Sequence, residues 1–355
     1  MKRIVLTGGG SAGHVTPHMA LIPQLLKDGW EIHYVGTADG IERELMAAYK
    51  EVTYHAISSG KLRRYLDIKN LRDPFRVIKG VGQSARLMHK LRPQVLFSKG
   101  GFVSVPAVIG ASLCGVPTVL HESDLTPGLA NKLCAPFSKK ILTSFEQTAK
   151  SIGAKAVYTG SPMRESLFNG DAKAGLAFTG LPGRKPVLLM MGGSLGAQAI
   201  NDCLREKLPE LLKHFEIIHL CGAGGLDPKL KNTPGYFQCE YVSDELPDLF
   251  ALCSLVLSRA GSNAIFELLA LGKPNLLIPL PLAASRGDQL LNAQNFEKAG
   301  YSKVLPQEEM TGETLVAALL DLWENRGLYV TAMGREPRRS GAQRVLQEIY
   351  ASAKK

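Results

Sequence analysis

Short runs of Val, Ile and Leu alternate along the chain with longer stretches in which apolar residues recur at helical spacing. In the first half these runs predict buried strands at 3–7, 31–35, 94–98, 118–121 and 140–143. The pattern restarts, and strands are predicted again at 186–191, 216–221, 236–240, 255–258 and 275–279. Apolar runs separated by helices are typical of parallel sheets that helices cover on both faces. The sequence therefore predicts an α/β protein with two doubly wound parallel sheets.

The two halves begin alike, because a Gly-Gly-Ser turn follows the first strand of each, at 9–11 and at 192–194. Glycine and proline interrupt the pattern between 160 and 175, and 355 residues suffice for two separate cores. We expect an N-terminal domain over 1–163, a second domain over 164–335, and a C-terminal helical segment over 336–355 that packs back on the first domain. Ligands of such folds bind at the carboxyl ends of the strands, so we expect a cleft where the two sheets face each other.

Composition and charge narrow the class of partner. Lys and Arg outnumber Asp and Glu by 42 to 32, which gives a formal net charge of +10 and predicts an anionic partner: phosphates, a membrane face or nucleic acid. The six cysteines lack metal-ligand spacing and are typical of buried thiols in a reducing compartment. The first apolar run ends at Gly8, too early for a signal peptide. Pro and Gly divide the uncharged stretch 100–120, which predicts a buried helix and strand rather than a membrane span.

The first glycine turn matches the dinucleotide-binding pattern G-x-G-x-x-G at Gly8, Gly10 and Gly13, before a helix that starts at Thr16. The second strand, however, ends at 34–37 without a carboxylate for a ribose diol, so a nicotinamide cofactor is not supported. What remains is a loop whose backbone N–H groups can approach an anion or a sugar. A tight turn that binds nothing is the alternative.

The presence of three such loops favours ligand binding over a tight turn that binds nothing, because turns at 99–101 and 192–194 also follow strands. Small-residue loops at several strand ends favour a ligand that carries a pyrophosphate. The sequence holds no Asp-x-Asp at a strand end and no His/Cys cluster, so we expect neither a metal nor a cofactor. Helix termini and arginine would meet the phosphate charge, with Arg164 as a candidate clamp. A solvated surface arginine is the alternative at this position.

Six motifs occur in a fixed order over nearly the whole chain: GGSAGHVTP at 9–17, GTAD at 36–39, KGGFVS at 99–104, HE at 121–122, GGSLGA at 192–197 and RAGSNAIFE at 259–267. Together they resemble the MurG family of N-acetylglucosaminyltransferases. The resemblance implies a GT-B fold, in which two Rossmann-like domains face each other across a cleft. It also implies inverting transfer of N-acetylglucosamine from UDP-GlcNAc to the 4-hydroxyl of the muramoyl sugar of lipid I, undecaprenyl-pyrophosphoryl-MurNAc-pentapeptide, which yields lipid II.

An inverting transfer needs a base at the acceptor hydroxyl, and His14 directly follows the first glycine turn. The resemblance makes it the candidate base, and a capping or core histidine is the alternative. Glu267 is expected to accept both ribose hydroxyls of the donor, Gln289 to bind the sugar, and the backbone of Val242 to contact uracil. A surface glutamate is the alternative for Glu267. The full set of implied donor contacts is Arg164, Gly193, Ser194, Val242, Ser262, Asn263, Ala264, Ile265, Phe266, Glu267 and Gln289.

Loops of the first domain are implied to face the acceptor, through Ser11, Ala12, Gly13, Thr16, Gly100, Gly101, His121, Glu122 and Asp124. Four positions depart from the usual pattern of the family. Phe102 stands where tyrosine is frequent, Asp124 where asparagine is common, Gln198 where an arginine follows Gly-Ala, and Asp288 where glutamine often stands. These differences leave the reaction class intact.

The segment 61–92 carries ten Lys or Arg and only two acidic residues, with apolar residues interleaved. Such a surface suits the anionic inner leaflet of the cell membrane. We therefore expect peripheral attachment at the cytoplasmic face of the membrane, through Arg72, Phe75, Arg76, Ile78 and Lys79. A helix that turns these apolar residues to the core is the alternative.

Other functions remain open on the sequence. A relative with another lipid acceptor, such as a diacylglycerol glycosyltransferase, or a UDP-sugar 2-epimerase would share the predicted fold. Nucleic acid is not an expected partner, because the positive charge is concentrated in one segment with few aromatic residues and no nucleic-acid motif occurs.

Overall fold

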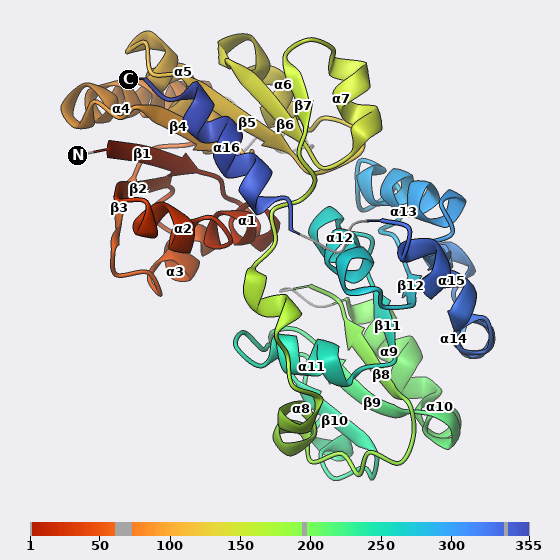
Figure 1. Cartoon of the computed structure of the whole chain (residues 1–355). Coiled ribbons are helices and arrows are strands. Elements are labelled where there is room, and N and C mark those ends of the chain that lie inside the picture. The colour runs from red at the N-terminus through yellow and green to blue at the C-terminus, as the bar shows by residue number, and fades with distance from the viewer. Residues whose placement is uncertain (1, 61–72, 194–196, 337–339, 355) are drawn as a thin grey trace. The chain divides into compact units, whose positions relative to one another are not determined.

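The computed structural model describes residues 2–60, 73–193, 197–336 and 340–354 (Figure 1). The chain forms two compact units. One consists of Met1–Arg164 with Ser340–Lys355, and the other of Glu165–Arg339. Each unit is built around its own parallel sheet.

The sheet of the first unit has seven strands in the order β3-β2-β1-β4-β5-β6-β7. The chain starts in the middle of the sheet and winds outward to both edges, so the strand order reverses between β1 and β4. The carboxyl ends of strands at such a switch point are where doubly wound folds bind ligands. The strands are β1 Lys2–Thr7, β2 Trp30–Gly36, β3 Val52–Ala56, β4 Val95–Ser98, β5 Thr118–Glu122, β6 Lys140–Thr143 and β7 Ala156–Tyr158.

Helices cover both faces of this sheet because successive strand residues point to opposite sides. Ile4 and Leu6 lie in one core and Val5 in the other. The second core receives the buried faces of α4 and α5, which pack against each other. The helices are α1 Thr16–Met19, α2 Ile22–Lys27, α3 Ile41–Met46, α4 Asp73–Leu91, α5 Ser104–Leu113, α6 Leu129–Cys134 and α7 Glu146–Ile152, with the short 3₁₀ turns η1 Ala12–His14 and η3 Ala135–Phe137.

The C-terminal helix α16, Ala342–Ser352, belongs to the first unit and contacts β4 and β5 (Figure 1). Val345 and Ile349 are fully buried in the same core as Ile4. The Ser340 hydroxyl bonds both the amide and the carbonyl of Met163, at 2.8 and 2.7 Å. The end of the chain is therefore tied to the segment that leaves the first sheet.

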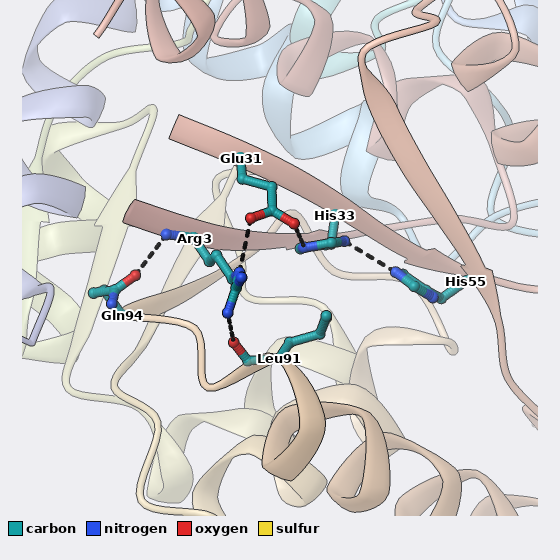
Figure 2. A network of polar contacts seen from close by, with 6 residues as sticks. All are labelled: Arg3, Glu31, His33, His55, Leu91 and Gln94. Carbon is teal, nitrogen blue, oxygen red and sulfur yellow. Dashed lines mark hydrogen bonds and ion pairs between the residues drawn. The ribbon is translucent and has the colours of Figure 1, made fainter. Parts of the chain in front are cut away.

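A polar network fastens β1, β2 and β3 to the end of α4 (Figure 2). Arg3 donates from Nε to Glu31 Oε2 at 2.7 Å and from Nη1 to the carbonyl of Leu91 at 3.0 Å. The other carboxylate oxygen of Glu31 lies 3.1 Å from His33 Nε2, and His33 Nδ1 lies 3.1 Å from His55 Nε2. Burial lowers the pKa of His33, so the network holds a neutral imidazole at neutral pH.

The second unit has six parallel strands in the order β10-β9-β8-β11-β12-β13, with the switch point between β8 and β11. Its strands are β8 Val187–Met191, β9 Glu216–Leu220, β10 Tyr236–Cys239, β11 Leu255–Ser258, β12 Asn275–Leu277 and β13 Lys303–Val304. Its helices are α8 Ala172–Thr179, α9 Gln198–Glu206, α10 Leu208–His214, α11 Leu246–Leu252, α12 Ser262–Leu271, α13 Asp288–Lys298, α14 Gly312–Glu324 and α15 Arg326–Met333.

All ten predicted strands are present, and the two parallel sheets confirm the predicted α/β class. Three further strands, β3, β7 and β13, were not predicted and lie at sheet edges. The uncharged stretch at 100–120 forms α5 and the start of β5, as predicted. Of the helices in the described ranges, none is long and apolar enough to cross a membrane.

Candidate functional site

Two glycine loops meet at the carboxyl edge of the first sheet. The loop after β1 contains Gly10 and the loop after β4 contains Gly100 and Gly101, and all three have φ near +85° (84 to 86°). A Cβ at Gly101 would lie 2.1 Å from the carbonyl oxygen of Gly9. Glycine is therefore required at 101 both for the backbone conformation and for the close approach of the loops.

His14 ends the short turn η1 and points its Nδ1 at the carbonyl oxygen of Lys99, at 2.9 Å. A carbonyl only accepts hydrogen bonds, so Nδ1 carries the hydrogen. In the neutral ring the lone pair then resides on Nε2, which is the tautomer that a general base needs. Thr16, at the start of α1, donates its hydroxyl to the carbonyl of Ala12 at 2.7 Å and thus steadies the same turn.

Lys99, to which the sequence assigned no role, joins the loop after β4 to the end of β5. Its side chain is buried, and Nζ lies 2.7 Å from His121 Nδ1 and also contacts the hydroxyl of Ser123. His121 Nε2 faces the carbonyl of Gly160 at 3.2 Å, so Nε2 holds the hydrogen and Nδ1 accepts from the lysine. Burial lowers the pKa of Lys99 to about 7, against the opposing charges of Glu122 and Asp124.

His121 and Glu122 are buried and bonded within the unit. Burial, and next the charge of Lys99, hold the pKa of His121 well below its usual range. Glu122 accepts from the amide of Gly128 at 2.9 Å, the side chain of Asn131 at 2.8 Å and the amide of Asp124 at 3.1 Å. Glu122 therefore supports the 123–128 loop from inside, whereas His121 joins Lys99 to the carbonyl of Gly160.

A second residue without a predicted role, Glu42 on α3, lies fully buried beside the first glycine loop. Its carboxylate accepts from the amide of Gly10 at 3.2 Å and from the amide and hydroxyl of Thr37 at 2.9 and 2.6 Å. The sequence held no carboxylate at the end of β2, and the structure brings one there from five residues beyond Thr37. Gly36 and Gly40 are the sequence features from which a buried carboxylate at this position could have been predicted.

Four predicted donor elements of the second unit follow the carboxyl ends of parallel strands and so lie at one edge of its sheet. Gly193, with φ +86°, follows β8, Val242 follows β10, α12 follows β11, and Gln289 lies on α13 after β12. Ser194 is outside the described residues. Ser262 opens α12 and is buried, whereas Asn263 and Ala264 are partly exposed.

Glu267 lies half-buried on α12, while its neighbours Ile265 and Leu268 are buried. Phe266 packs edge-on against Phe296 of α13, with ring centroids 5.4 Å apart. Arg259 donates to the carbonyl of Ile278 at 3.1 Å and so joins the ends of β11 and β12. The helix that carries Glu267 is thereby held by packing on α13 and by the strands beneath it.

Three single residues complete the predicted donor set. Gln289 uses its side-chain oxygen to accept from the amide of Leu280 at 3.2 Å, which leaves its NH₂ group as the donor side. Val242 is 5% exposed, so its side chain is packed inside the unit and is not available for recognition. Arg164 is partly exposed at the end of the first unit, and its buried Nε has no hydrogen-bond partner among the described residues.

The predicted membrane residues lie on α4, except Arg72, which is outside the described residues. Phe75 and Ile78 are 74% and 68% exposed, and Arg76 and Lys79 are exposed with them. Within the described ranges, no group of three or more His, Cys, Asp or Glu is arranged to hold a metal ion.

Solved structures identify the class. The chain matches the fold of Acinetobacter baumannii MurG with a TM-score of 0.76 at 23% identity, covering 99% of this chain and 100% of that one. It also matches a putative UDP-N-acetylglucosamine 2-epimerase from Listeria monocytogenes, with a TM-score of 0.69 at 14% identity over 99% of this chain and 96% of that one. Two doubly wound units with glycine loops at their strand ends thus define a GT-B fold.

The sequence comparisons are more specific than the fold. The model of the glycosyltransferase family 28 N-terminal domain matches residues 4–143, and that of the family 28 C-terminal domain matches 187–349. A protein of Geobacillus thermodenitrificans is 56% identical over 351 residues, 99% of this chain and 98% of the relative. It is named UDP-N-acetylglucosamine–N-acetylmuramyl-(pentapeptide) pyrophosphoryl-undecaprenol N-acetylglucosamine transferase. The chain belongs to glycosyltransferase family 28 and, within it, to the MurG group, which confirms the resemblance predicted from its motifs.

The buried Lys99 gives a test of the site that does not depend on turnover. Its pKa is lowered from 10.5 to about 7 in the folded chain, so between these values the unfolded chain binds a proton that the folded chain lacks. Stability therefore rises with pH over this range. We expect the free energy of unfolding of the wild type, relative to Lys99→Met, to increase by about 2 kcal/mol from pH 7 to pH 9 in urea titrations.

Lys132→Met, at an exposed lysine, is the matched control: it keeps Lys99, so its free energy of unfolding should rise with pH as that of the wild type does. A constant difference between the wild type and Lys99→Met across this range would contradict a buried lysine with a lowered pKa.

Proposed function

We propose that this protein transfers N-acetylglucosamine from UDP-GlcNAc to the 4-hydroxyl of the muramoyl sugar of lipid I and so makes lipid II for peptidoglycan synthesis. The observation that carries the proposal is the 56% identity over nearly the full length of a relative named for this transfer. Both the N-terminal and the C-terminal domain of the family are present in the chain, which supports the proposal.

His14 is the proposed base. In an inverting transfer the base removes the proton of the acceptor hydroxyl while UDP leaves from the opposite face of the anomeric carbon. The hydrogen bond from Nδ1 to the carbonyl of Lys99 supports this role, because it leaves the lone pair on Nε2. Once Nε2 has taken the proton, the ring is a cation, and the same bond becomes charge-assisted and stronger. Proton transfer is thus favoured by a contact that already exists.

The second unit is proposed to bind the donor at the carboxyl edge of its sheet. The loop at Gly193 and the first turn of α12 offer backbone N–H groups to the diphosphate, and Arg164 offers a guanidinium. The carboxylate of Glu267 accepts the two ribose hydroxyls. The NH₂ group of Gln289 donates to the sugar, and the backbone of Val242 contacts uracil. Departing UDP is stabilised by these donors, without a role for a metal ion.

The loops at 11–13, 100–101 and 123–124 are proposed to receive lipid I. The contact between Gly101 and Gly9 and the bonds of Glu122 support this proposal, since they hold the loops in one arrangement. A preformed backbone surface of this kind lowers the entropy lost when a sugar binds.

We also propose that α4 docks the protein on the anionic cytoplasmic face of the cell membrane. The face of α4 toward the unit includes the small residues Gly80 and Ser84, which are buried against α5. A Cβ at Gly80 would lie 2.0 Å from the carbonyl of Ser58. The large residues Phe75 and Ile78 are therefore on the outer face, beside Arg76 and Lys79. Apolar residues with adjacent positive charge favour an anionic lipid surface.

The base is tested with His14→Asn, in which the amide NH₂ can replace Nδ1–H toward Lys99 while the basic Nε2 is lost. With UDP-GlcNAc and a short-chain lipid I analogue, the wild type should yield the β-linked disaccharide, identified by NMR of the product. We expect kcat of the variant to fall by about 10² to 10⁴ and the donor Kd, measured by calorimetry, to stay within about twofold. Equal losses of kcat and donor affinity would indicate a structural role for His14.

Ribose recognition is tested with 2′-deoxy-UDP-GlcNAc. A charged hydrogen bond contributes about 1.5 to 3 kcal/mol, so the wild type should prefer the natural donor at least tenfold in kcat/KM. Glu267→Ala should lose this preference, whereas Glu297→Ala on α13 should keep it. If Glu267→Ala discriminates as strongly as the wild type, the assignment is wrong.

Membrane docking is tested by sedimentation with vesicles of phosphatidylglycerol and phosphatidylcholine. Each Lys or Arg near an anionic surface contributes about 1 kcal/mol, so the double variant Arg76→Glu/Lys79→Glu should bind at least tenfold more weakly. Phe75→Ser/Ile78→Ser should also weaken binding, and Lys213→Glu in the second unit should not. Binding that is unchanged by both double variants would exclude α4 as the docking surface.

A further inference from the structure

Glu42 is a fully buried carboxylate that meets only neutral donors among the described residues. Its three bonds come from the amide of Gly10 and from the amide and hydroxyl of Thr37. An ionised carboxylate without a cation is costly to bury unless its oxygens are well bonded. The geometry meets this condition, since both oxygens accept and three donors converge on them.

Three glycines make the space for this carboxylate. A Cβ at Gly9 would lie 2.6 Å from the carboxyl carbon of Glu42, and one at Gly40 would lie 2.3 Å from the same atom. At Gly36 a Cβ would lie 2.7 Å from Cγ of Glu42. Of these three glycines, none has a positive φ, so the absence of a side chain at each serves space rather than backbone conformation. The pocket is thus shaped to the carboxylate.

Two tyrosines, Tyr34 fully buried and Tyr54 partly buried, complete the arrangement around Glu42. Tyr34 donates to the carbonyl of Gly8 at 2.7 Å and Tyr54 to the carbonyl of Thr37 at 2.6 Å, and the two rings are stacked. Burial, and next the negative charge of Glu42, raise the pKa of both hydroxyls. The carboxylate therefore accepts hydrogen bonds from the N–H groups of the loops after β1 and β2. The tyrosine hydroxyls donate to carbonyl groups of the same two loops.

In doubly wound folds the loop after the first strand offers its N–H groups to an anion of the ligand. Here the chain supplies that anion itself, at the amide of Gly10. The same loop continues through Ser11 to His14, whose amide bonds the carbonyl of Ser11 at 3.1 Å. We infer that Glu42 is a positioning residue, whose carboxylate takes the place of a ligand anion at the first glycine loop and thereby sets that loop, and His14 with it, for catalysis.

This inference rests on the proposed function for its kinetic readout, and chemical rescue separates it from a general effect on folding. Glu42→Ala leaves a cavity with three unpaired donors, into which formate or acetate fits. We expect kcat to fall at least tenfold, the UDP Kd to remain unchanged, and either carboxylate at millimolar concentration to restore much of the loss. Formamide and chloride should restore nothing.

Two variants control for structure. Glu42→Gln keeps the volume but sets a donor NH₂ against an N–H group in either orientation, so it should also lose kcat and should not respond to formate. Glu44→Ala removes an exposed carboxylate of the same helix and should behave as the wild type. If both Glu42 variants unfold, if their kcat is unchanged, or if carboxylates fail to rescue Glu42→Ala, the inference is wrong.

A readout without turnover distinguishes this inference from the proposed function. With ¹⁵N-labelled histidine, the Nδ1–H signal of His14, assigned through His14→Asn, should shift in Glu42→Ala and return with formate. If Glu42→Ala shows this response but the wild type transfers no sugar, the proposed function alone is overturned. A signal that does not change in Glu42→Ala would overturn the positioning role alone.

Discussion

The close approach of two backbones at the switch point of the first sheet is the constraint on which the site depends. Gly101 lies against Gly9 at a distance that excludes any side chain, and the amide of Lys99 donates to the carbonyl of Thr7 at 2.9 Å. This pairing extends the β1–β4 register beyond the strands and brings the carbonyl of Lys99 to His14. The tautomer of the proposed base is thus a consequence of strand order, because only neighbouring parallel strands end side by side.

Polar groups are buried around this edge at a cost that their partners offset. Lys99 is bonded to an imidazole and a hydroxyl, and Glu42 to three donors. The second unit also buries a histidine, His219, between Tyr236 and Asn201, and burial lowers its pKa to about 3. That ring has both nitrogens bonded inside the domain, so it braces β9 and β10 and is not available for proton transfer.

Most of the fold and part of the site could be predicted from the sequence, and the exceptions have two physical causes. Central strands are buried on both faces and show as apolar runs, whereas β3, β7 and β13 are edge strands with half-exposed residues. Loop residues such as Gly100 were predictable because motifs follow strands locally. Glu42 was not, because it meets Gly10 only after the chain has crossed to the neighbouring strand.

The helix α4 shows why periodicity alone could not decide between a core face and a docking face. Its apolar residues recur at helical spacing, which predicts burial in a globular protein. A Cβ would lie 2.0 Å from its nearest neighbouring atom at Gly80 and 2.6 Å at Gly110, so α4 packs tightly on α5 where these glycines lie. Phe75 and Ile78 lie on the outer face, although the hydrophobic pattern favours their burial. At Gly80 the carbonyl of Ser58 leaves no room for a side chain, so this glycine is the sequence feature that marks the inner face of α4.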